Sequence, residues 1–175
     1  MRSALSLNQA AQLGDVATVQ SHLDAGVSVD QRTTGETALM GASYSGKTEV
    51  AELLLDRGAS VDMQDTKGWT ALMWACFRGW TEVARALLDR GAKIDTQDRD
   101  GFTALMRASF TGKKDAVALL VERGANLDLQ DKDGWTALMW ARSVGRRDVA
   151  PLLSHRLVTL GSPENPSPEK KAPWQ

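Results

Sequence analysis

The chain has 175 residues, 42% of them hydrophobic, so it can bury one compact core or form a short repeat array, and wholesale disorder is excluded. Its 21 basic and 22 acidic residues give a net charge of −1, which leaves no electrostatic footprint for nucleic acid. The single cysteine, Cys76, excludes an internal disulfide, and no apolar run is long enough to span a bilayer. We therefore expect a soluble, unexported protein of the cytoplasm or the nucleus.

The first 34 residues carry a weakened form of a pattern that returns along the chain. The apolar and small residues of 7–14 match those of 39–46 at an interval of 32, whereas Ser21 and His22 stand where later units have leucines. We expect residues 1–34 to form a degenerate first unit that caps one end of an array.

From residue 35 the pattern repeats in register. The motif Gly-x-Thr-Ala-Leu-Met begins at residues 35, 68, 101 and 134, always 33 residues apart. A second block, LLLDRGASVDMQD at 53–65, returns at the same step. A fixed period without insertions predicts repeated structural units at 35–67, 68–100 and 101–133.

The sequence pattern of each unit predicts two short helices. In the unit at 68–100, apolar and small residues follow helical spacing first at Leu72 and Ala75 and then at Val83 and Leu87. The second helix has an acidic residue at its start and Arg-Gly at its end, which suits the helix dipole and a left-handed cap. Turn-forming residues between units predict hairpin-like loops. Because so short a helix pair cannot bury its apolar face alone, the units must stack into a solenoid.

The unit at 134–160 closes the array. Arg142 takes the place that Cys76 has in the third unit, and Pro151 falls early in the last helix, where a missing amide hydrogen costs least. These replacements predict a C-terminal capping unit. Residues 161–175 hold four of the five prolines and almost no apolar side chains, so we expect a disordered, proline-rich tail.

Together these motifs resemble ankyrin repeats. The shared features are the period of 33, the Gly-x-Thr-x-Leu-x-x-Ala start and the Leu-Leu-x-x-Gly-Ala block near the end of each unit. The resemblance implies an all-α solenoid of stacked antiparallel helix pairs, with five repeats of which the first and last are caps. The usual Thr-Pro-Leu-His reads Thr-Ala-Leu-Met here, so methionine packing should replace the hydrogen bonds of histidine. The methionines concerned are Met40, Met73, Met106 and Met139.

The resemblance also implies where a partner would bind, because the first helices of such stacks line a concave surface. In the helix after Gly68, Trp74, Phe77 and Arg78 lie opposite the packed face. Their repeat equivalents and the aromatic residues at the loop tips complete a set of candidate contact residues. The set is Tyr44, Trp69, Trp74, Phe77, Arg78, Phe102, Arg107, Phe110, Trp135 and Trp140. Tryptophan, tyrosine and arginine are enriched at binding hot spots, so we expect this groove to bind an extended peptide or a helix.

Two alternatives stay open. The aromatic side chains can pack on one another along the stack and stabilise the array without a ligand, as we expect for Trp80. The chain can also be a structural or regulatory subunit of a larger complex that uses its convex face or its tail. In that case changes in the groove would leave binding unaffected.

Catalytic chemistry has little support in the sequence. His22 and His155 lie at opposite ends of the array, so neither forms a dyad or a metal site with Cys76, and no phosphate-binding glycine loop is present. We expect no enzyme activity, no cofactor and no metal. The sequence thus predicts a monomeric, non-catalytic adaptor or scaffold that binds another protein, and neither nucleic acid directly nor a membrane.

Overall fold

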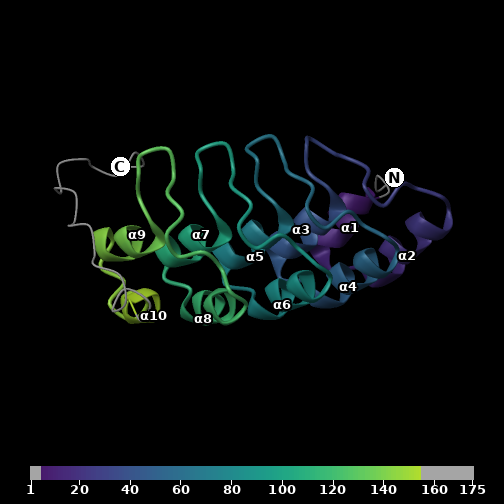
Figure 1. Ribbon diagram of the computed structural model, residues 1–175. Helices are drawn as coiled ribbons and strands as arrows, with labels where there is room; N and C mark the ends of the chain where they lie inside the picture. Colours follow the sequence, from purple (N-terminus) through teal and green to yellow (C-terminus); the bar gives the residue numbers. More distant parts are fainter. Residues whose placement is uncertain (1–4, 155–175) are drawn as a thin grey trace.

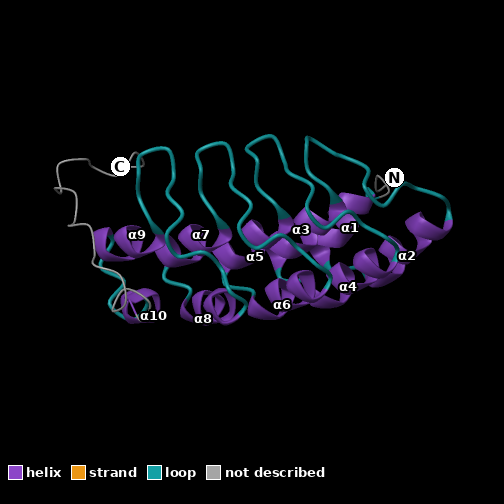
Figure 2. Ribbon diagram, viewed as in Figure 1, coloured by secondary structure: helices purple, strands orange, loops and turns teal. Residues whose placement is uncertain are grey.

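The computed structural model describes residues 5–154, which form ten helices in five consecutive pairs (Figures 1 and 2). In chain order the pairs are α1 (Leu7–Leu13) and α2 (Val16–Asp24), α3 (Ala38–Ser45) and α4 (Thr48–Asp56), α5 (Ala71–Arg78) and α6 (Thr81–Asp89), α7 (Ala104–Thr111) and α8 (Lys114–Glu122), and α9 (Ala137–Ser143) and α10 (Ala150–Ser154). Within this range the only β pairing is an isolated bridge between Thr33 and Glu36. The prediction of an all-helical solenoid is confirmed. The expected disordered tail and His155 lie outside the described residues.

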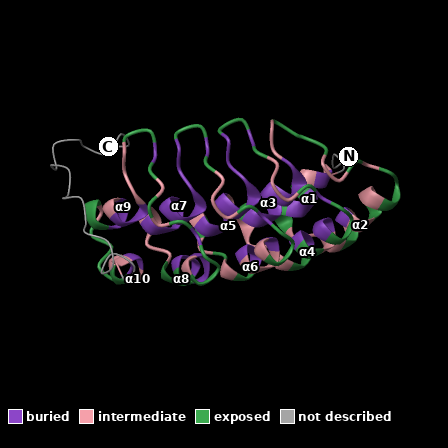
Figure 3. Ribbon diagram, in the orientation of Figure 1, coloured by how far each residue is buried: buried purple, intermediate pink, exposed green. Residues whose placement is uncertain are grey.

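The helices form two layers, with the loops on one side. The first helix of each pair lies in one row and the second helix in a parallel row, while the loops between pairs project beyond the first row (Figure 1). Buried residues lie on the parts of the helices that face neighbouring pairs and the other row (Figure 3), and the apolar ones among them form one continuous cluster. Small residues such as Ala75 and Ala108, both fully buried, allow the first helices to approach closely.

Local sequence explains where the first helices begin. Thr70 accepts a hydrogen bond from the backbone N–H of Met73 at 3.3 Å, and the equivalent threonines cap α3, α7 and α9 in the same way. Met73 is itself buried, as are Met40 and Met106. The expected methionine packing is therefore present in the three inner repeats, whereas Met139 in the last repeat is half-buried.

The second helices carry a row of exposed ion pairs, called here the outer row. Each arginine that follows the last residue of a second helix pairs with an aspartate of the preceding repeat. The pairs are Arg57–Asp24 at 3.0 Å, Arg90–Asp56 at 2.7 Å and Arg123–Asp89 at 2.7 Å. The arginines thus link neighbouring repeats in addition to complementing the helix dipole.

The loops also contact one another through their backbones. The N–H of Arg99 donates to the carbonyl of Lys67 at 3.1 Å, and the N–H of Lys132 donates to that of Asp100 at 3.0 Å. Gly68 makes the first contact possible, because it has a φ of 83° and a Cβ there would lie 2.8 Å from the nitrogen of Arg99. The loops therefore stack in the same order as the helices.

Candidate protein-interaction face

Three buried aspartates shape the turns that lead into α5, α7 and α9. In Asp98, Oδ1 accepts hydrogen bonds from the backbone N–H groups of Asp100 and Phe102, both at 2.9 Å. Asp65 and Asp131 make the same two bonds within their own turns. The carboxylates thereby fold each turn back and place its aromatic residue against the following helix.

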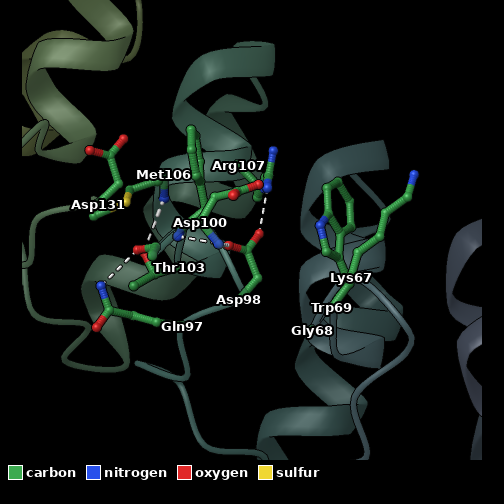
Figure 4. A network of polar contacts seen from close by, with 12 residues as sticks. Lys67, Gly68, Trp69, Gln97, Asp98, Asp100, Thr103, Met106, Arg107 and Asp131 are labelled. Carbon is green, nitrogen blue, oxygen red and sulfur yellow. Dashed lines mark hydrogen bonds and ion pairs between the residues drawn. The ribbon is translucent and has the colours of Figure 1, made fainter. Parts of the chain in front are cut away.

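The second oxygen of each aspartate binds a side chain nine residues further along the chain. Asp65 accepts from the indole Nε1 of Trp74 at 3.2 Å, and Asp131 accepts from that of Trp140 at 2.7 Å. In the repeat between them, Asp98 pairs with the guanidinium of Arg107 (Figure 4). Trp74, Arg107 and Trp140 occupy equivalent positions and are called here the inner row.

The inner row joins the aromatic residues of the turns into a continuous stack. The guanidinium of Arg107 lies 4.2 Å from the ring centroid of Trp69 and 4.0 Å from that of Phe102. On one side Trp69 contacts Trp74 with centroids 4.1 Å apart, and on the other Phe102 contacts Trp140 at 5.2 Å. The buried arginine therefore sits between two aromatic groups, where its attraction to both rings and to Asp98 offsets the loss of water.

Further aromatic residues border this stack. Trp135 lies 4.7 Å from Trp140, Phe110 contacts Trp140 edge to face, and Phe77 contacts Trp69 in the same manner. At the N-terminal end, Tyr44 meets the edge of Trp74 at 5.3 Å. The stack thus runs from α3 to α9 and includes all ten candidate residues except Arg78, whose guanidinium lies over the ring of Tyr44 at 4.8 Å.

One repeat lacks both parts of this arrangement. Arg32 stands where the later repeats have the turn aspartate, and Gly41 stands where they have Trp74, Arg107 or Trp140. Arg32 instead donates to the backbone carbonyls of Gly35 and Gln64. At Gly41 a Cβ would lie 2.9 Å from Cγ of Gln12, so α1 occupies the space that an inner-row side chain needs. This repeat therefore lacks both the turn aspartate and the side chain that would donate to it.

A comparison with protein-family models decides the family. The model for ankyrin repeats, which describes three copies, matches residues 7–98 and 91–160. This chain belongs to the ankyrin-repeat family. Ankyrin repeats are generally protein-interaction modules without catalytic activity, so the coarse prediction of protein binding is confirmed. A comparison with curated proteins gives no match.

The ankyrin-repeat structure corrects the expectation that all ten candidate residues line an open surface. Trp69, Phe102, Arg107 and Trp140 are buried, with Trp140 only 2% exposed. Their burial follows from the turns, which fold over the first helices, and from stacking against the next repeat. In the sequence analysis each helix was considered by itself, and so neither the turn nor the next repeat was taken into account. That the ten residues contact a partner stays a prediction, and in this conformation these four have little surface to offer.

The remaining candidates keep accessible surface. Tyr44 and Arg78 are exposed, while Trp74, Phe77, Phe110 and Trp135 are half-buried at the edge of the stack. Trp80, interpreted from the sequence as structural, does pack on its neighbours, because its Nε1 donates to the carbonyl of Tyr44 at 2.9 Å. Its indole nevertheless is 41% exposed. The accessible part of the face therefore centres on α3, α5 and the turn after α5.

The turn aspartates were not included in the sequence analysis among the residues that shape the candidate face. Each aspartate bends its turn and also fixes an inner-row side chain. The signal was present in the ankyrin repeats themselves. Asp65, Asp98 and Asp131 each precede a tryptophan or arginine by nine residues, and the repeat without the aspartate has glycine at that place.

The described residues offer few groups for catalysis. Cys76 is fully buried, and burial raises the pKa of its thiol from 9.0 to about 12, so it remains protonated at neutral pH. In His22, Nε2 lies 2.7 Å from the carbonyl oxygen of Leu5. Between residues 5 and 154, no cluster of three or more histidine, cysteine or acidic side chains suits a metal ion. No helix in the same range has the length and apolarity to cross a membrane.

Proposed function

We propose that this protein is a non-catalytic adaptor or scaffold that binds a peptide or helix of another protein on the accessible edge of its aromatic stack. This contact surface, called here the inner face, consists of Tyr44, Trp74, Phe77, Arg78, Phe110 and Trp135. The observation that carries the proposal is that exposed and half-buried aromatic side chains are held in place by a buried network behind them. We place the binding in the cytoplasm or the nucleus.

The buried network reduces the cost of binding. Trp74 is fixed by its hydrogen bond to Asp65 and by contact with Trp69, so it loses little rotational freedom when a partner arrives. Aromatic side chains contribute large contact areas with few rotatable bonds. The buried residues therefore support the proposal as the base of the inner face, while the edge residues make the contact.

The chain supplies its own substitutions for a test. Tyr44, Phe77 and Phe110 have Ser143 as their equivalent in the last repeat, so serine is compatible with the fold at this position. We expect each change to serine to weaken partner binding by roughly 1 to 4 kcal/mol, as at other aromatic hot spots. Arg85→Ala, on the exposed side of α6, is the matched control, and circular dichroism checks that the helices remain.

Photo-crosslinking identifies the partner and the face together. A benzophenone amino acid replaces Tyr44 or Phe110 in one set of proteins and Arg85 in another, and crosslinked partners are identified by mass spectrometry. We expect a partner that crosslinks from positions 44 and 110 but not from position 85. Partners that crosslink only from position 85, with affinity unchanged in the serine variants, would instead favour a subunit that binds through its outer helices.

A further inference from the structure

One repeat departs from the pattern of the others on both sides of Gly79. The equivalents of Arg78 in the second, fourth and last repeats are uncharged: Ser45, Thr111 and Val144. The equivalents of Trp80 in the same repeats are cations: Lys47, Lys113 and Arg146. In the third repeat the cation instead precedes the glycine, and a tryptophan takes the place of the cation that follows it.

Arg78 and Trp80 both reach back to Tyr44 of the preceding repeat. Arg78 lies over the tyrosine ring, and Trp80 donates to the tyrosine carbonyl. The indole of Trp80 also covers Gly46, where φ is 69° and a Cβ would lie 2.5 Å from the ring. Tyr44 is thus held by Arg78, Trp80 and the edge of Trp74, and yet remains 39% exposed. Tyr44 and Trp80 therefore present accessible aromatic surface next to the guanidinium of Arg78.

Arg78 has hydrogen-bonding capacity to spare. Within residues 5–154 its guanidinium takes part in none of the ion pairs, whereas the outer-row arginines all pair with aspartates. Stacking on a ring engages the flat face of a guanidinium and leaves its N–H edge available for two parallel bonds to a carboxylate. Arg78 therefore has N–H donors available for an acidic group that the described part of the chain does not provide.

The surroundings of Arg78 favour a negative partner. The side chain of Lys113 packs over Gly79, with Cδ 2.8 Å from where a Cβ would be, so a second cationic side chain lies against the residue that follows Arg78. Glu82, in the first turn of α6, pairs with Arg85 at 3.8 Å. The helix dipole does not require a cation here, because α1, α3 and α7 have no basic residue in their last turns.

We propose that Tyr44, Arg78, Trp80 and Lys113 bind a peptide segment in which an acidic side chain stands next to an apolar one. Arg78 and Lys113 receive the carboxylate, and the exposed rings of Tyr44 and Trp80 receive the apolar neighbour. This inference rests on the proposed function and names the chemistry of the partner.

Selection from a random library tests this chemistry without a known partner. A phage-displayed library of random peptides is selected on the immobilised full-length protein. Enriched peptides are then measured against the four variants described below and against Phe77→Ser and Phe110→Ser. Arg78→Thr uses the residue of the next repeat, Thr111, and Tyr44→Ser uses that of the last, Ser143. Arg85→Thr is the matched control for removal of an arginine.

We expect peptides with an acidic residue beside an apolar one, whose binding weakens roughly tenfold or more in Arg78→Thr and in Tyr44→Ser. It should be unchanged in Arg85→Thr. Arg78→Lys keeps the charge but loses the stacked, two-bond geometry, so we expect an intermediate loss. Raising the salt concentration should weaken binding to the wild type more than to Arg78→Thr.

The other outcomes separate the two proposals. Peptides that depend on Phe77 and Phe110 but lack acidic residues, and that bind Arg78→Thr as well as wild type, would overturn the acidic–apolar inference and leave the inner face as a binding surface. A selection that enriches no peptide sensitive to any inner-face substitution would overturn both.

Discussion

Two sets of aspartates accept hydrogen bonds from cationic or polar side chains in this solenoid: those of the outer row and those of the turns. The two sets differ in how far they are buried. The outer row joins neighbouring repeats through exposed pairs such as Asp89–Arg123, in which the aspartate side chain is 56% accessible. The turn aspartates lie inside the array, and the side chain of Asp98 has no accessible surface at all. The same chemical pair is therefore a minor addition in one place and a structural requirement in the other, because water screens only the first.

Breaking the buried ion pair should have the largest effect. In Asp98→Asn the amide oxygen can still accept the two turn N–H groups, but Arg107 loses the charge that balances it. We expect unfolding free energy to fall by about 3 to 5 kcal/mol, as for other buried pairs with one partner removed. Urea unfolding followed by circular dichroism measures the loss.

The control for this change removes the cation and keeps the aspartate. Arg107→Trp introduces the residue that the repeats on either side use, and its indole N–H can bind Asp98 as Trp74 and Trp140 bind their aspartates. We expect this variant to be close to wild type in stability. If Asp98→Asn were as mild as Arg107→Trp, the buried charge would not need its partner, and the contrast between the rows would fail.

Breaking the hydrogen bond between Asp65 and the uncharged indole of Trp74 should lower the free energy of unfolding by less. Asp65→Asn keeps an oxygen for the turn but directs an NH₂ group at the indole N–H of Trp74. The indole donor is then left without an acceptor, which costs about 1 to 3 kcal/mol. Trp74→Phe removes that donor. Asp65→Asn should therefore lower the free energy of unfolding less in a Trp74→Phe protein than in the wild type, as urea unfolding would measure. Equal losses in both backgrounds would show that the carboxylate serves the turn alone.

The dependence of stability on alkaline pH tests the burial of the Cys76 thiol. The thiol of Cys76 has a pKa of 9.0 when unfolded and about 12 when buried, so the unfolded chain releases its proton first as pH rises. Stability should therefore fall between these two pKa values, by about 1.4 kcal/mol at pH 10. Cys76→Ser, with the residue found at positions 43 and 109, should lack this decline. Parallel pH profiles of the two proteins would contradict the burial of the thiol.

Breaking an outer pair should have the smallest effect. Asp89→Asn removes the charge that Arg123 contacts at 2.7 Å, but both groups are accessible to water. We expect a loss of at most about 1 kcal/mol, which shrinks further at high salt. Urea unfolding at low and high salt measures both. A loss as large as that of Asp98→Asn would mean that repeat coupling depends on the outer row.

The stacking of helices was predictable from sequence, whereas the burial of the face was not. The 33-residue period fixes where each helix begins and which residues it turns inward, so Leu72 and Ala75 were correctly assigned to the core. The position of Trp69 depends on a turn that folds back through Asp65, and that of Arg107 depends on rings from two repeats. Periodicity within a helix carries no information about contacts of this kind.

The stacked indoles also make this protein report optically on its own integrity. Trp69 and Trp74 form one close pair in the third repeat, and Trp135 and Trp140 form another in the last. Indole rings at such separations couple their electronic transitions and give paired near-ultraviolet circular dichroism bands that disappear when the rings part. Because repeat arrays can lose structure from one end, the two pairs mark separate segments. When one tryptophan pair is replaced with phenylalanine, the circular dichroism signal of the other pair reports on its own repeat alone. The third and the last repeat can thus be followed separately without a label.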